Sequence, residues 1–291
     1  AGSAFHGSDA VGGAVQLITR QPESTELRLR ASVGNFGVNQ QSASLSAPLG
    51  RIWQRLAFSR DFSSGFRDNR DYRNLSLSST TSARTRLGTT NLLLAHNDRP
   101  FGADQFYGNF NSWERTKGLF AAVRQDLGER MNAFASYRRH TDLFVLYRDR
   151  PQVFTNRHVA ESWQGAWRRR DPVGSNGAFH YGVEAYRDTI LSNNLGRHQR
   201  GRGGAFAAYD LRALKRFSFT AAAREEIYGS FDKQFSPSVG GGFWISERLK
   251  LRASSSRAFR IPSFTDLYYQ DPGNRGSPFL RPEKAWSHEA G

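Results

Sequence analysis

Apolar and polar residues alternate along most of the chain from residue 26 onward, in segments of about ten residues. In the first segment, Leu27, Leu29 and Val33 alternate with Arg28 and Arg30. An arginine on the lipid face of a membrane barrel costs about 2–4 kcal/mol at the bilayer midplane, whereas a watery lumen hydrates it. The alternation therefore predicts barrel strands that turn leucine toward lipid and arginine toward an enclosed aqueous interior.

The same split recurs at residues 52–61, 179–186, 217–224 and 249–254. The connections between segments alternate in length. Short turns rich in Gly, Asn, Asp and Ser lie at 48–51, 127–130, 173–176 and 246–248, and longer connections lie at 63–73, 99–112, 147–155, 192–200 and 260–284. Short turns at one end and long loops at the other are typical of bacterial outer-membrane barrels, and the count predicts about fourteen strands and no helix of useful length.

Composition removes several classes of protein. No apolar run approaches the roughly 20 residues of a helical membrane span, and a mean hydropathy of -0.63 fits a barrel whose alternate residues face water. The net charge of +15 comes from 36 arginines and five lysines that are scattered along the chain, so a soluble nucleic-acid-binding β protein is a distant alternative. The lack of cysteine excludes disulfides, thiol nucleophiles and Cys-based metal sites.

Aromatic residues stand near the ends of several segments, where membrane barrels carry interfacial girdles. Ordinary packing within a soluble β core is the alternative, because such residues occur in any strand. The girdle candidates are Trp53, Phe62, Trp113, Tyr147, Trp163 and Trp244.

A glycine-rich stretch from residue 5 to residue 20 precedes the first alternating segment. Glycine permits a positive φ and close backbone approach, and the apolar run at 15–18 can add a strand to a small sheet. The stretch resembles the end of the plug domain of TonB-dependent outer-membrane receptors, although Gln16 stands where that family usually has Asn. No signal peptide is present, and the sequence opens within this motif. The residues that carry the resemblance are Gly7, Ser8, Ala10, Gly12 and Gly13.

The region from residue 257 to residue 291 resembles a strand-to-loop exit of the barrel of the same family. Pro262 and Pro282 lack a backbone donor, which suits positions where a strand leaves or enters the ladder. Glu283 and Glu289 can pair with arginines of neighbouring strands inside the lumen. The other matching positions are Leu267, Tyr268, Gly273, Asn274, Leu280 and Gly291.

A third stretch, residues 182–188 followed by 193–200, is similar to a mid-barrel hairpin of that family, including members that resemble the cobalamin receptor. The three stretches occur in the expected order, so the resemblance spans nearly the whole chain. The family's energy-coupling segment, most of its plug and its last strands are missing from this sequence.

The resemblance implies an all-β fold: an antiparallel transmembrane β-barrel, with about 14 of an expected 22 strands present. Residues 1–22 would be the end of the plug domain, and residues 23–291 the first two-thirds of the barrel. The implied function is TonB-dependent import of a ferric siderophore or a cobalamin-like corrinoid across the bacterial outer membrane. A plugless porin or adhesin barrel is the alternative.

The same resemblance implies partners and excludes others. Outer-membrane lipid and lipopolysaccharide would surround the barrel, and a TonB-type protein would couple energy through the missing N-terminal segment. The cargo would be an iron siderophore or a corrinoid. We expect no enzymatic activity, no cofactor, no structural metal and no nucleic-acid partner.

Two long connections carry aromatic and arginine residues that suit ligand binding. Planar arginine forks match carboxylate or phosphate groups, and rings supply stacking area. Packing of the loops against each other, with contacts to lipopolysaccharide phosphates, is an equally good interpretation. The first group is Phe101, Phe106, Tyr107, Phe110 and Trp113, and the second is Arg260, Phe264, Tyr268, Tyr269 and Arg275.

Three further patterns contain residue types that can carry chemistry. Ser136 and His140 share a strand face, as a hydrolase pair would, but a polar lumen face explains them better and nothing else supports hydrolysis. Asp68 and Asp71 supply oxygens for calcium, although neighbouring arginines neutralise them. A general acid–base pair of Glu161 and Glu184 has no support beyond its carboxylates, and we expect both to be solvated lumen residues.

Overall fold

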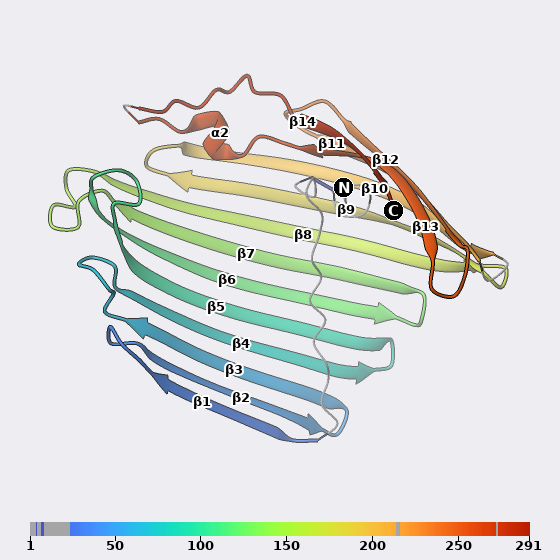
Figure 1. Ribbon diagram of the computed structural model, residues 1–291, viewed down its shortest axis with the longest axis horizontal. Coiled ribbons are helices and arrows are strands. Elements are labelled where there is room, and N and C mark those ends of the chain that lie inside the picture. Colours follow the sequence, from blue (N-terminus) through green and yellow to red (C-terminus); the bar gives the residue numbers. More distant parts are fainter. Residues whose placement is uncertain (1–3, 5–6, 9–23, 214–215, 272) are drawn as a thin grey trace.

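The computed structural model describes residues 4, 7, 8, 24–213, 216–271 and 273–291, and most of them form one antiparallel sheet whose strands follow in sequence order (Figure 1). This confirms the all-β prediction and the expected fourteen strands. The strands are β1 (Glu26–Val33), β2 (Asn39–Leu49), β3 (Ile52–Ser63), β4 (Tyr72–Thr85), β5 (Gly88–Asp104), β6 (Asn111–Leu127), β7 (Met131–Val145), β8 (Thr155–Val173), β9 (Gly177–Ser192), β10 (Gly196–Ala213), β11 (Phe217–Tyr228), β12 (Gln234–Trp244), β13 (Lys250–Arg260) and β14 (Glu283–Ala290).

The sheet is curved, and its two faces differ in chemistry. Residues directly opposite each other on neighbouring strands share a face. Leu29 lies opposite Ala43, Ala43 opposite Phe58, and Phe58 opposite Leu77. This row stands on the convex face, where Leu29 is 72% exposed. The outward direction predicted for the apolar residues is therefore confirmed, and the intervening polar residues face the concave side.

The connections sort by length between the two ends of the wall. Gly50, Gly128 and Gly174 take positive φ in short turns at one end. At the other end, the longer connections at 64–71, 146–154 and 261–282 follow the predicted ones closely, whereas the connection at 105–110 is much shorter than the predicted loop at 99–112. The predicted loop at 192–200 is wrong, because β9 ends at Ser192 and β10 begins at Gly196. The polar residues of this segment belong to the ends of β9 and β10, which extend beyond the part of the wall whose convex face is apolar.

The connection after β13 contains one short helix, α2 (Phe264–Tyr268). Ser263 caps it: its hydroxyl accepts a hydrogen bond from the Asp266 amide at 3.1 Å, and the Asp266 carboxylate accepts one from the Ser263 amide at 2.8 Å. Backbone donors from Ser263 lower the pKa of Asp266. Among the described residues, no helix is long and apolar enough to cross a membrane.

The predicted aromatic girdle is partly correct. Trp163 stands on the convex face with 55% exposure, and its ring lies 4.4 Å from that of Tyr137. The girdle prediction is wrong for Trp53. This residue lies between the outward residues Ile52 and Gln54 along β3, faces the concave side and is 9% exposed. Period-two alternation alone reaches the same result, because Leu56 points outward and Trp53 has the opposite parity.

The edges of the wall remain open. In the described sheet, β1 pairs with β2 alone and β14 pairs with β13 alone. Each unpaired backbone donor or acceptor in lipid costs several kcal/mol. An edge strand is therefore stable in a bilayer only where its free backbone groups are paired.

Candidate functional site

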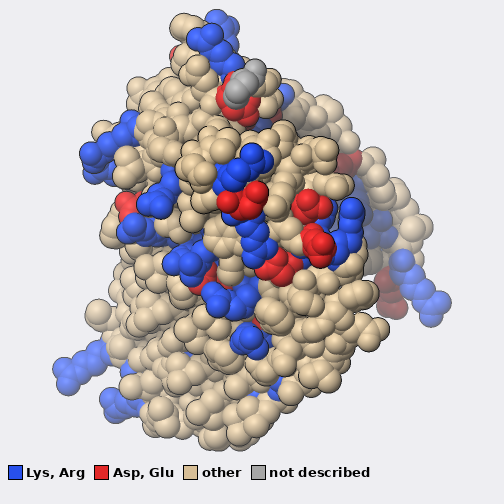
Figure 2. Space-filling model, turned by 90° about the vertical axis from the view of Figure 1, so that its left-hand side faces the viewer, with Lys and Arg blue, Asp and Glu red and all other residues tan. Residues whose placement is uncertain are grey.

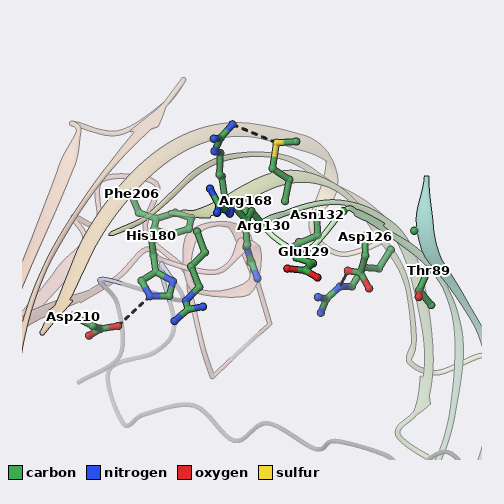
Figure 3. A pocket seen from close by; sticks show the side chains of 15 residues that line it. Thr89, Asp126, Glu129, Arg130, Asn132, Arg168, His180, Phe206 and Asp210 are labelled. Carbon is green, nitrogen blue, oxygen red and sulfur yellow. Dashed lines mark hydrogen bonds and ion pairs between the residues drawn. The ribbon is translucent and has the colours of Figure 1, made fainter. Parts of the chain in front are cut away.

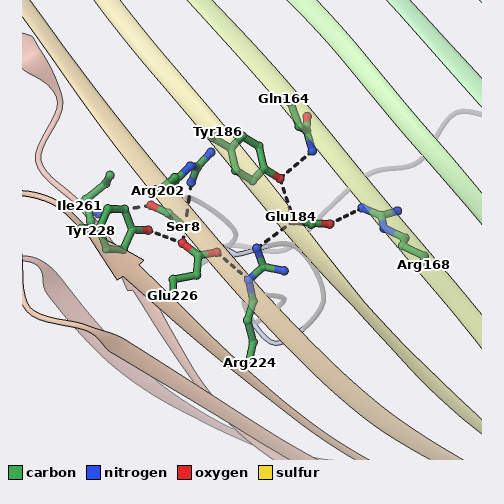
Figure 4. A network of polar contacts seen from close by, with 10 residues as sticks. All are labelled: Ser8, Gln164, Arg168, Glu184, Tyr186, Arg202, Arg224, Glu226, Tyr228 and Ile261. Carbon is green, nitrogen blue, oxygen red and sulfur yellow. Dashed lines mark hydrogen bonds and ion pairs between the residues drawn. The ribbon is translucent and has the colours of Figure 1, made fainter.

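A network of buried ions lies on the concave face across β8 to β11 (Figure 4). Arg224 of β11 donates from Nε to Glu226 at 2.6 Å and from Nη2 to Glu184 of β9 at 2.8 Å. Arg168 of β8 donates to the other oxygen of Glu184 at 2.6 Å. Tyr228 donates its hydroxyl proton to Glu226. Strands β8, β9 and β11 are thus connected by one chain of charge-assisted hydrogen bonds that crosses β10.

A glycine makes this network possible. Glu184 and Glu226 both lie opposite Gly204 of β10, so the strand between them presents no side chain. A Cβ at Gly204 would stand 3.0 Å from Nη2 of Arg224 and 3.1 Å from Cγ of Glu226. The Arg224 side chain therefore reaches across β10 to Glu184 through space that any other residue would occupy.

Burial makes the network costly to disturb. The side chains of Arg224, Glu226 and Glu184 are each 1% exposed. Removing one partner from a buried ion pair leaves an uncompensated charge and costs about 3–5 kcal/mol. Nη1 of Arg224 is buried without a hydrogen-bond partner among the described residues. This donor is directed into the packed interior rather than into solvent.

Residues from the start of the chain pack on this network. Ala4 is 2% exposed in a cluster with Ala208 and Ala222 of the concave face. Ser8 accepts a hydrogen bond from the backbone N–H of Ile261 at 3.3 Å. Gly7 has a φ of 72°, as the predicted glycine turn requires, and a Cβ there would stand 2.2 Å from Oε1 of Glu226. The predicted residues Ala10, Gly12 and Gly13 lie outside the described part of the chain.

A second concave surface lies near the short turns, where a cavity of about 800 Å³ opens (Figure 3). Arg130, Arg168 and His180 point into it, together with Glu129. Nε2 of His180 lies 3.2 Å from the carboxylate of Asp210 on β10. The cavity therefore combines several cations with a smaller number of carboxylates on the inner side of the wall.

The first group of predicted ligand residues is only partly in a loop. Phe101 lies in β5 and Trp113 in β6, because both strands extend into the segment predicted to be one loop. Phe106, Tyr107 and Phe110 do lie in the 105–110 connection. Strand pairing of Phe101 with Glu114 and of Gly102 with Trp113 explains the correction.

The loop members of this group contact other loops and strand ends. The Arg70 guanidinium lies 4.1 Å above the Phe106 ring. Tyr107 packs edge-to-face on Phe144 at 5.0 Å and donates to Glu114 at 2.7 Å. Burial and the bond to Glu114 raise the pKa of Tyr107. These rings therefore pack against neighbouring loops and strand ends, while Phe106 stays 52% exposed.

The second group surrounds α2. The predicted loop position of Arg260 is wrong, because Arg260 is the last residue of β13, where it pairs with Glu283 at 3.3 Å. Tyr268 stacks on His198 of β10 with ring centroids 3.6 Å apart. The Arg200 guanidinium lies 4.8 Å from the Phe264 ring.

The remaining predicted positions of the α2 connection hold its shape. Asp271 accepts hydrogen bonds from the amides of Gly273 and Asn274, two of the motif positions, at 2.7 and 2.6 Å. Burial raises the pKa of Asp271, but hydrogen bonds from the Asn274 side chain and from the two amides outweigh it, so the pKa is lowered. Tyr269 donates its amide to Thr265 at 3.0 Å.

Several residues of the C-terminal motif have clear structural positions. Leu267 is buried, and Pro262 accepts a hydrogen bond from Arg200 at 2.8 Å. Glu289 is contacted by Ser287 at 3.4 Å rather than by an arginine. Other motif members are Leu280, Pro282 and Gly291, of which Gly291 pairs with the backbone of Arg252. Arg275, the last of the predicted ligand residues, forms an isolated antiparallel bridge with Gln270.

An ionic clamp joins the long connections at the loop end. Arg148 donates to both carboxylate oxygens of Asp71, at 2.5 and 3.1 Å, and to Asn69 at 2.7 Å. Asn69 donates to Asn111 at 2.6 Å. The Arg148 contact holds the pKa of Asp71 below its usual value. Basic and acidic side chains gather together at this end of the wall (Figure 2).

These positions correct two of the alternatives considered for the sequence. The Asp71 carboxylate is occupied by Arg148, 77 residues away, rather than free for calcium. Glu161 lies opposite Arg139 and Thr189 on the convex face, whereas Glu184 is on the concave face. Glu161 is therefore not a lumen residue, and the two carboxylates cannot act as an acid–base pair. Within the described residues, no cluster of His, Asp and Glu has a geometry for a metal ion.

Sequence reasoning missed the buried network as a unit. Arg224 and Glu226 are two residues apart and so share a strand face, which is a readable signal. The contact with Glu184 depends on the register of three strands and on the missing side chain at Gly204, and neither is visible in one segment alone.

A curved antiparallel wall with an apolar convex face and an ionic concave face has the architecture of an outer-membrane barrel. The family model described as TonB dependent receptor-like, beta-barrel, matches residues 23–291. The chain therefore belongs to the TonB-dependent receptors, a family of outer-membrane receptors and transporters.

Individual relatives agree with this assignment. The vitamin B12 transporter BtuB of Photobacterium profundum is 25% identical over 308 residues, which cover 99% of this chain and 49% of that protein. The siderophore receptor PirA from Pseudomonas aeruginosa superposes with a TM-score of 0.78 at 17% identity, over 99% of this chain and 56% of PirA. A mutant of the ferric enterobactin receptor PfeA from the same organism superposes with a TM-score of 0.79 at 14% identity, over 99% of this chain and 53% of PfeA. The chain thus spans about half the length of these relatives.

Proposed function

We propose that the chain forms part of the wall of an energy-coupled importer in the bacterial outer membrane, with a ferric siderophore or a cobalamin-like corrinoid as cargo. Family membership supports the receptor class. The names of the relatives, a vitamin B12 transporter and siderophore receptors, support the two cargo classes. The observation that carries the proposal is the packing of Ala4, Gly7 and Ser8 on the concave face, because a plug must seal against that face.

The contact geometry suits a plug that moves. Among the described residues, Ser8 accepts one hydrogen bond, of 3.3 Å, from Ile261 directly after β13, and Gly7 packs closely without a side chain of its own. Arg224 is neutralised by Glu226 and Glu184, which both belong to the wall. The wall therefore keeps its charges paired when the plug segment leaves, and displacement exposes no isolated buried charge.

The proposed division of the chain follows from this contact. Residues 1–22 would be the end of the plug, and residues 23–291 the barrel wall. The plug would block the lumen until a TonB-type protein, acting through a segment outside this sequence, displaces it. A plug is required at this size, because a barrel of about twenty-two strands has an open lumen.

Cargo recognition is assigned to the loop end. Phe106 and Tyr107 expose half of their surface there, at 52% and 53%. Rings and arginine forks together suit a large planar or anionic ligand. The clamp between Asp71 and Arg148 fixes the neighbouring loop, so these rings are presented on a fixed surface.

The test uses the full-length receptor in a bacterium that lacks its own cobalamin and siderophore receptors. Growth is measured on limiting vitamin B12 and, separately, on iron supplied as ferric enterobactin. We expect growth on one of the two, and its loss when the energy-coupling protein is deleted. Growth that persists without that protein would overturn the importer assignment.

A second measurement separates the importer from a plugless porin or adhesin barrel. The purified full-length protein is reconstituted in liposomes, and swelling in small sugars is followed. A plugged wall predicts no swelling, together with saturable binding of the cargo. Rapid swelling without cargo binding would support the diffusion porin. If the protein showed neither swelling nor cargo binding, the adhesin barrel would be supported.

A further inference from the structure

Three arginines lie on the convex face near the loop end of the wall. Arg139 of β7 lies opposite Glu161 of β8, and Arg187 of β9 lies opposite Trp163 of β8. Arg197 lies at the start of β10, opposite Leu191. The strand register places all three on the side that carries the exposed apolar residues, away from the concave network. An arginine on this face is stable only where headgroups or water are within its reach.

The depth of these arginines follows from strand length. A tilted strand crosses the hydrocarbon in roughly 9–11 residues, whereas β8 has 19 residues, β9 has 16 and β10 has 18. The excess extends from the loop end. The ring pair of Tyr137 and Trp163 marks the interface, as aromatic girdles do; in the strand register it is level with Arg187, and Arg139 and Arg197 lie closer to the loop end. The arginines therefore lie at the level of the outer-leaflet headgroups.

The three side chains border one hollow in the outer surface. Its volume is about 870 Å³, and its lining includes Arg139, Arg187, Arg197, Trp163 and Gln199. A volume of this order holds a sugar–phosphate group. The floor is partly apolar, so the hollow joins a charged rim to a surface that acyl chains can contact.

The charges in the hollow are unbalanced. Glu161 is the one acidic residue of the lining; it accepts from the Tyr137 hydroxyl at 2.7 Å and lies 3.7 Å from Arg139. Arg187 uses one nitrogen, to Gln199 at 2.8 Å. Arg197 is exposed, and within the described residues its guanidinium has no ion-pair partner. Most of the guanidinium donors therefore remain available.

An arginine elsewhere on the same face is paired differently. On β5 and β6, Asp98 accepts two hydrogen bonds from Arg115, at 2.8 and 2.6 Å, and also lies 3.8 Å from Arg73. The guanidinium of Arg115 is thus bound on two nitrogens by a carboxylate of the protein itself. The hollow on β7 to β10 lacks an equivalent carboxylate.

We propose that Arg139, Arg187 and Arg197 form a binding site for the phosphate groups of an outer-leaflet lipid, whose acyl chains extend along the apolar convex face below. Guanidinium forks bind phosphate through paired, charge-assisted hydrogen bonds. The site rests on the outer-membrane placement in the proposed function, and it is independent of the cargo and of the plug.

The test titrates the purified full-length receptor with diphosphoryl lipid A and counts retained lipid by native mass spectrometry. We expect one tightly held lipid on the wild type. The triple variant R139Q/R187Q/R197Q should bind it at least about tenfold more weakly, because three charge-assisted contacts are lost. Lipid A without its phosphates should bind the wild type as weakly as the intact lipid binds the triple variant.

The control variant R51Q/R84Q/R86Q removes the same charge from exposed arginines at the short-turn end. It should retain lipid A as the wild type does. The proposal would be overturned if both triple variants bound lipid A equally well. It would also be overturned if the wild type bound dephosphorylated lipid A as tightly as intact lipid A. If the first triple variant does not fold, R187Q and R197Q are measured singly, each with a smaller expected loss. Inorganic phosphate that binds as tightly as the lipid would assign the hollow to a free anion and overturn the lipid site. Cargo uptake by the folded variants should stay normal, so a failure here is distinct from a failure of the importer.

Discussion

The two faces of strands β8 to β11 use the same residue type in opposite ways. Arg168 and Arg169 are adjacent in sequence, yet Arg168 binds Glu184 on the concave face, whose side chain is 1% exposed, while Arg169 binds Asp171, whose side chain is 29% exposed. On the concave side Arg168 binds a buried carboxylate, although it is itself 46% exposed, and Arg224 is a buried ion. On the convex side near the loop end arginine is exposed and incompletely paired. Strand parity, rather than residue type, therefore decides what an arginine does in this wall.

The largest expected effect comes from breaking the concave network. Glu226→Ala should lower the unfolding free energy of the full-length receptor by about 3–5 kcal/mol, because Arg224 loses its Nε partner while buried. The measurement is the temperature at which the folded band disappears on a detergent gel. Glu289→Ala, an exposed carboxylate of β14 that no arginine contacts among the described residues, is the matched control and should change little. Equal shifts for the two variants would contradict the burial argument.

A smaller effect is expected at the contact between the plug segment and the wall. Gly7→Ala places a Cβ 2.2 Å from Oε1 of Glu226, so the segment must shift. The expected result is increased entry of a large antibiotic into cells that express the full-length receptor.

Gly50→Ala provides the control for Gly7. Gly50 also has a positive φ, 65° against 72°, but no atom lies within 4 Å of a Cβ built there. The two variants therefore share the backbone strain of about 1 kcal/mol, and only Gly7→Ala adds the clash. Equal antibiotic entry in both strains would contradict the proposed contact between Gly7 and the wall.

The adjacent arginines sharpen the comparison further. Arg168→Gln should destabilise the receptor by about 1–3 kcal/mol, because Glu184 is buried and keeps one cationic partner, Arg224. Arg169→Gln should leave thermal stability close to wild type, since its partner is solvated. Thermal melts of both proteins in one detergent decide the order, and a larger loss for Arg169→Gln would reverse the face assignment.

The smallest effect is a pH dependence at the loop clamp. Arg148 lowers the pKa of Asp71, so the contribution of this pair is complete above the unfolded aspartate pKa of about 3.9 and is lost as pH falls through the lower folded value. Pepsin cleavage within 64–71 and 146–154 should therefore accelerate as pH falls below about 3.9. In Arg148→Gln the acceleration should disappear, because cleavage is already fast at higher pH. A wild-type profile that is flat over this range would show that the clamp does not hold the loops.

Much of this architecture is visible in the sequence. The alternation of Leu27 and Arg28 gives the direction of each face, and the length of the connections separates the two ends. The same rule predicts that Glu161 and Trp163 share a face, so the interior position expected for Glu161 was an avoidable error. Loop boundaries at 99–112 and 192–200 were wrong because strands above the apolar band carry polar residues and therefore resemble loops.

The buried network could not be predicted from individual segments. Glu184, Gly204 and Arg224 are separated along the chain, and their contact depends on the register of β9, β10 and β11. The outer arginine hollow has the same origin, because Arg139, Arg187 and Arg197 come from three strands. Alternation gives the face of a residue but not its neighbours in the next strand.

The central claim, that parity separates lipid from a sealed interior, can be measured directly along β9. The chain has no cysteine, so single cysteines at residues 179–186 can each carry a spin label in the full-length receptor in lipid. Collision with oxygen, which concentrates in hydrocarbon, should be high at Phe179, Tyr181, Val183 and Ala185 and low at the residues between them. Uniform accessibility to oxygen, or a water-soluble nickel complex that reaches Val183 more readily than oxygen does, would contradict the account.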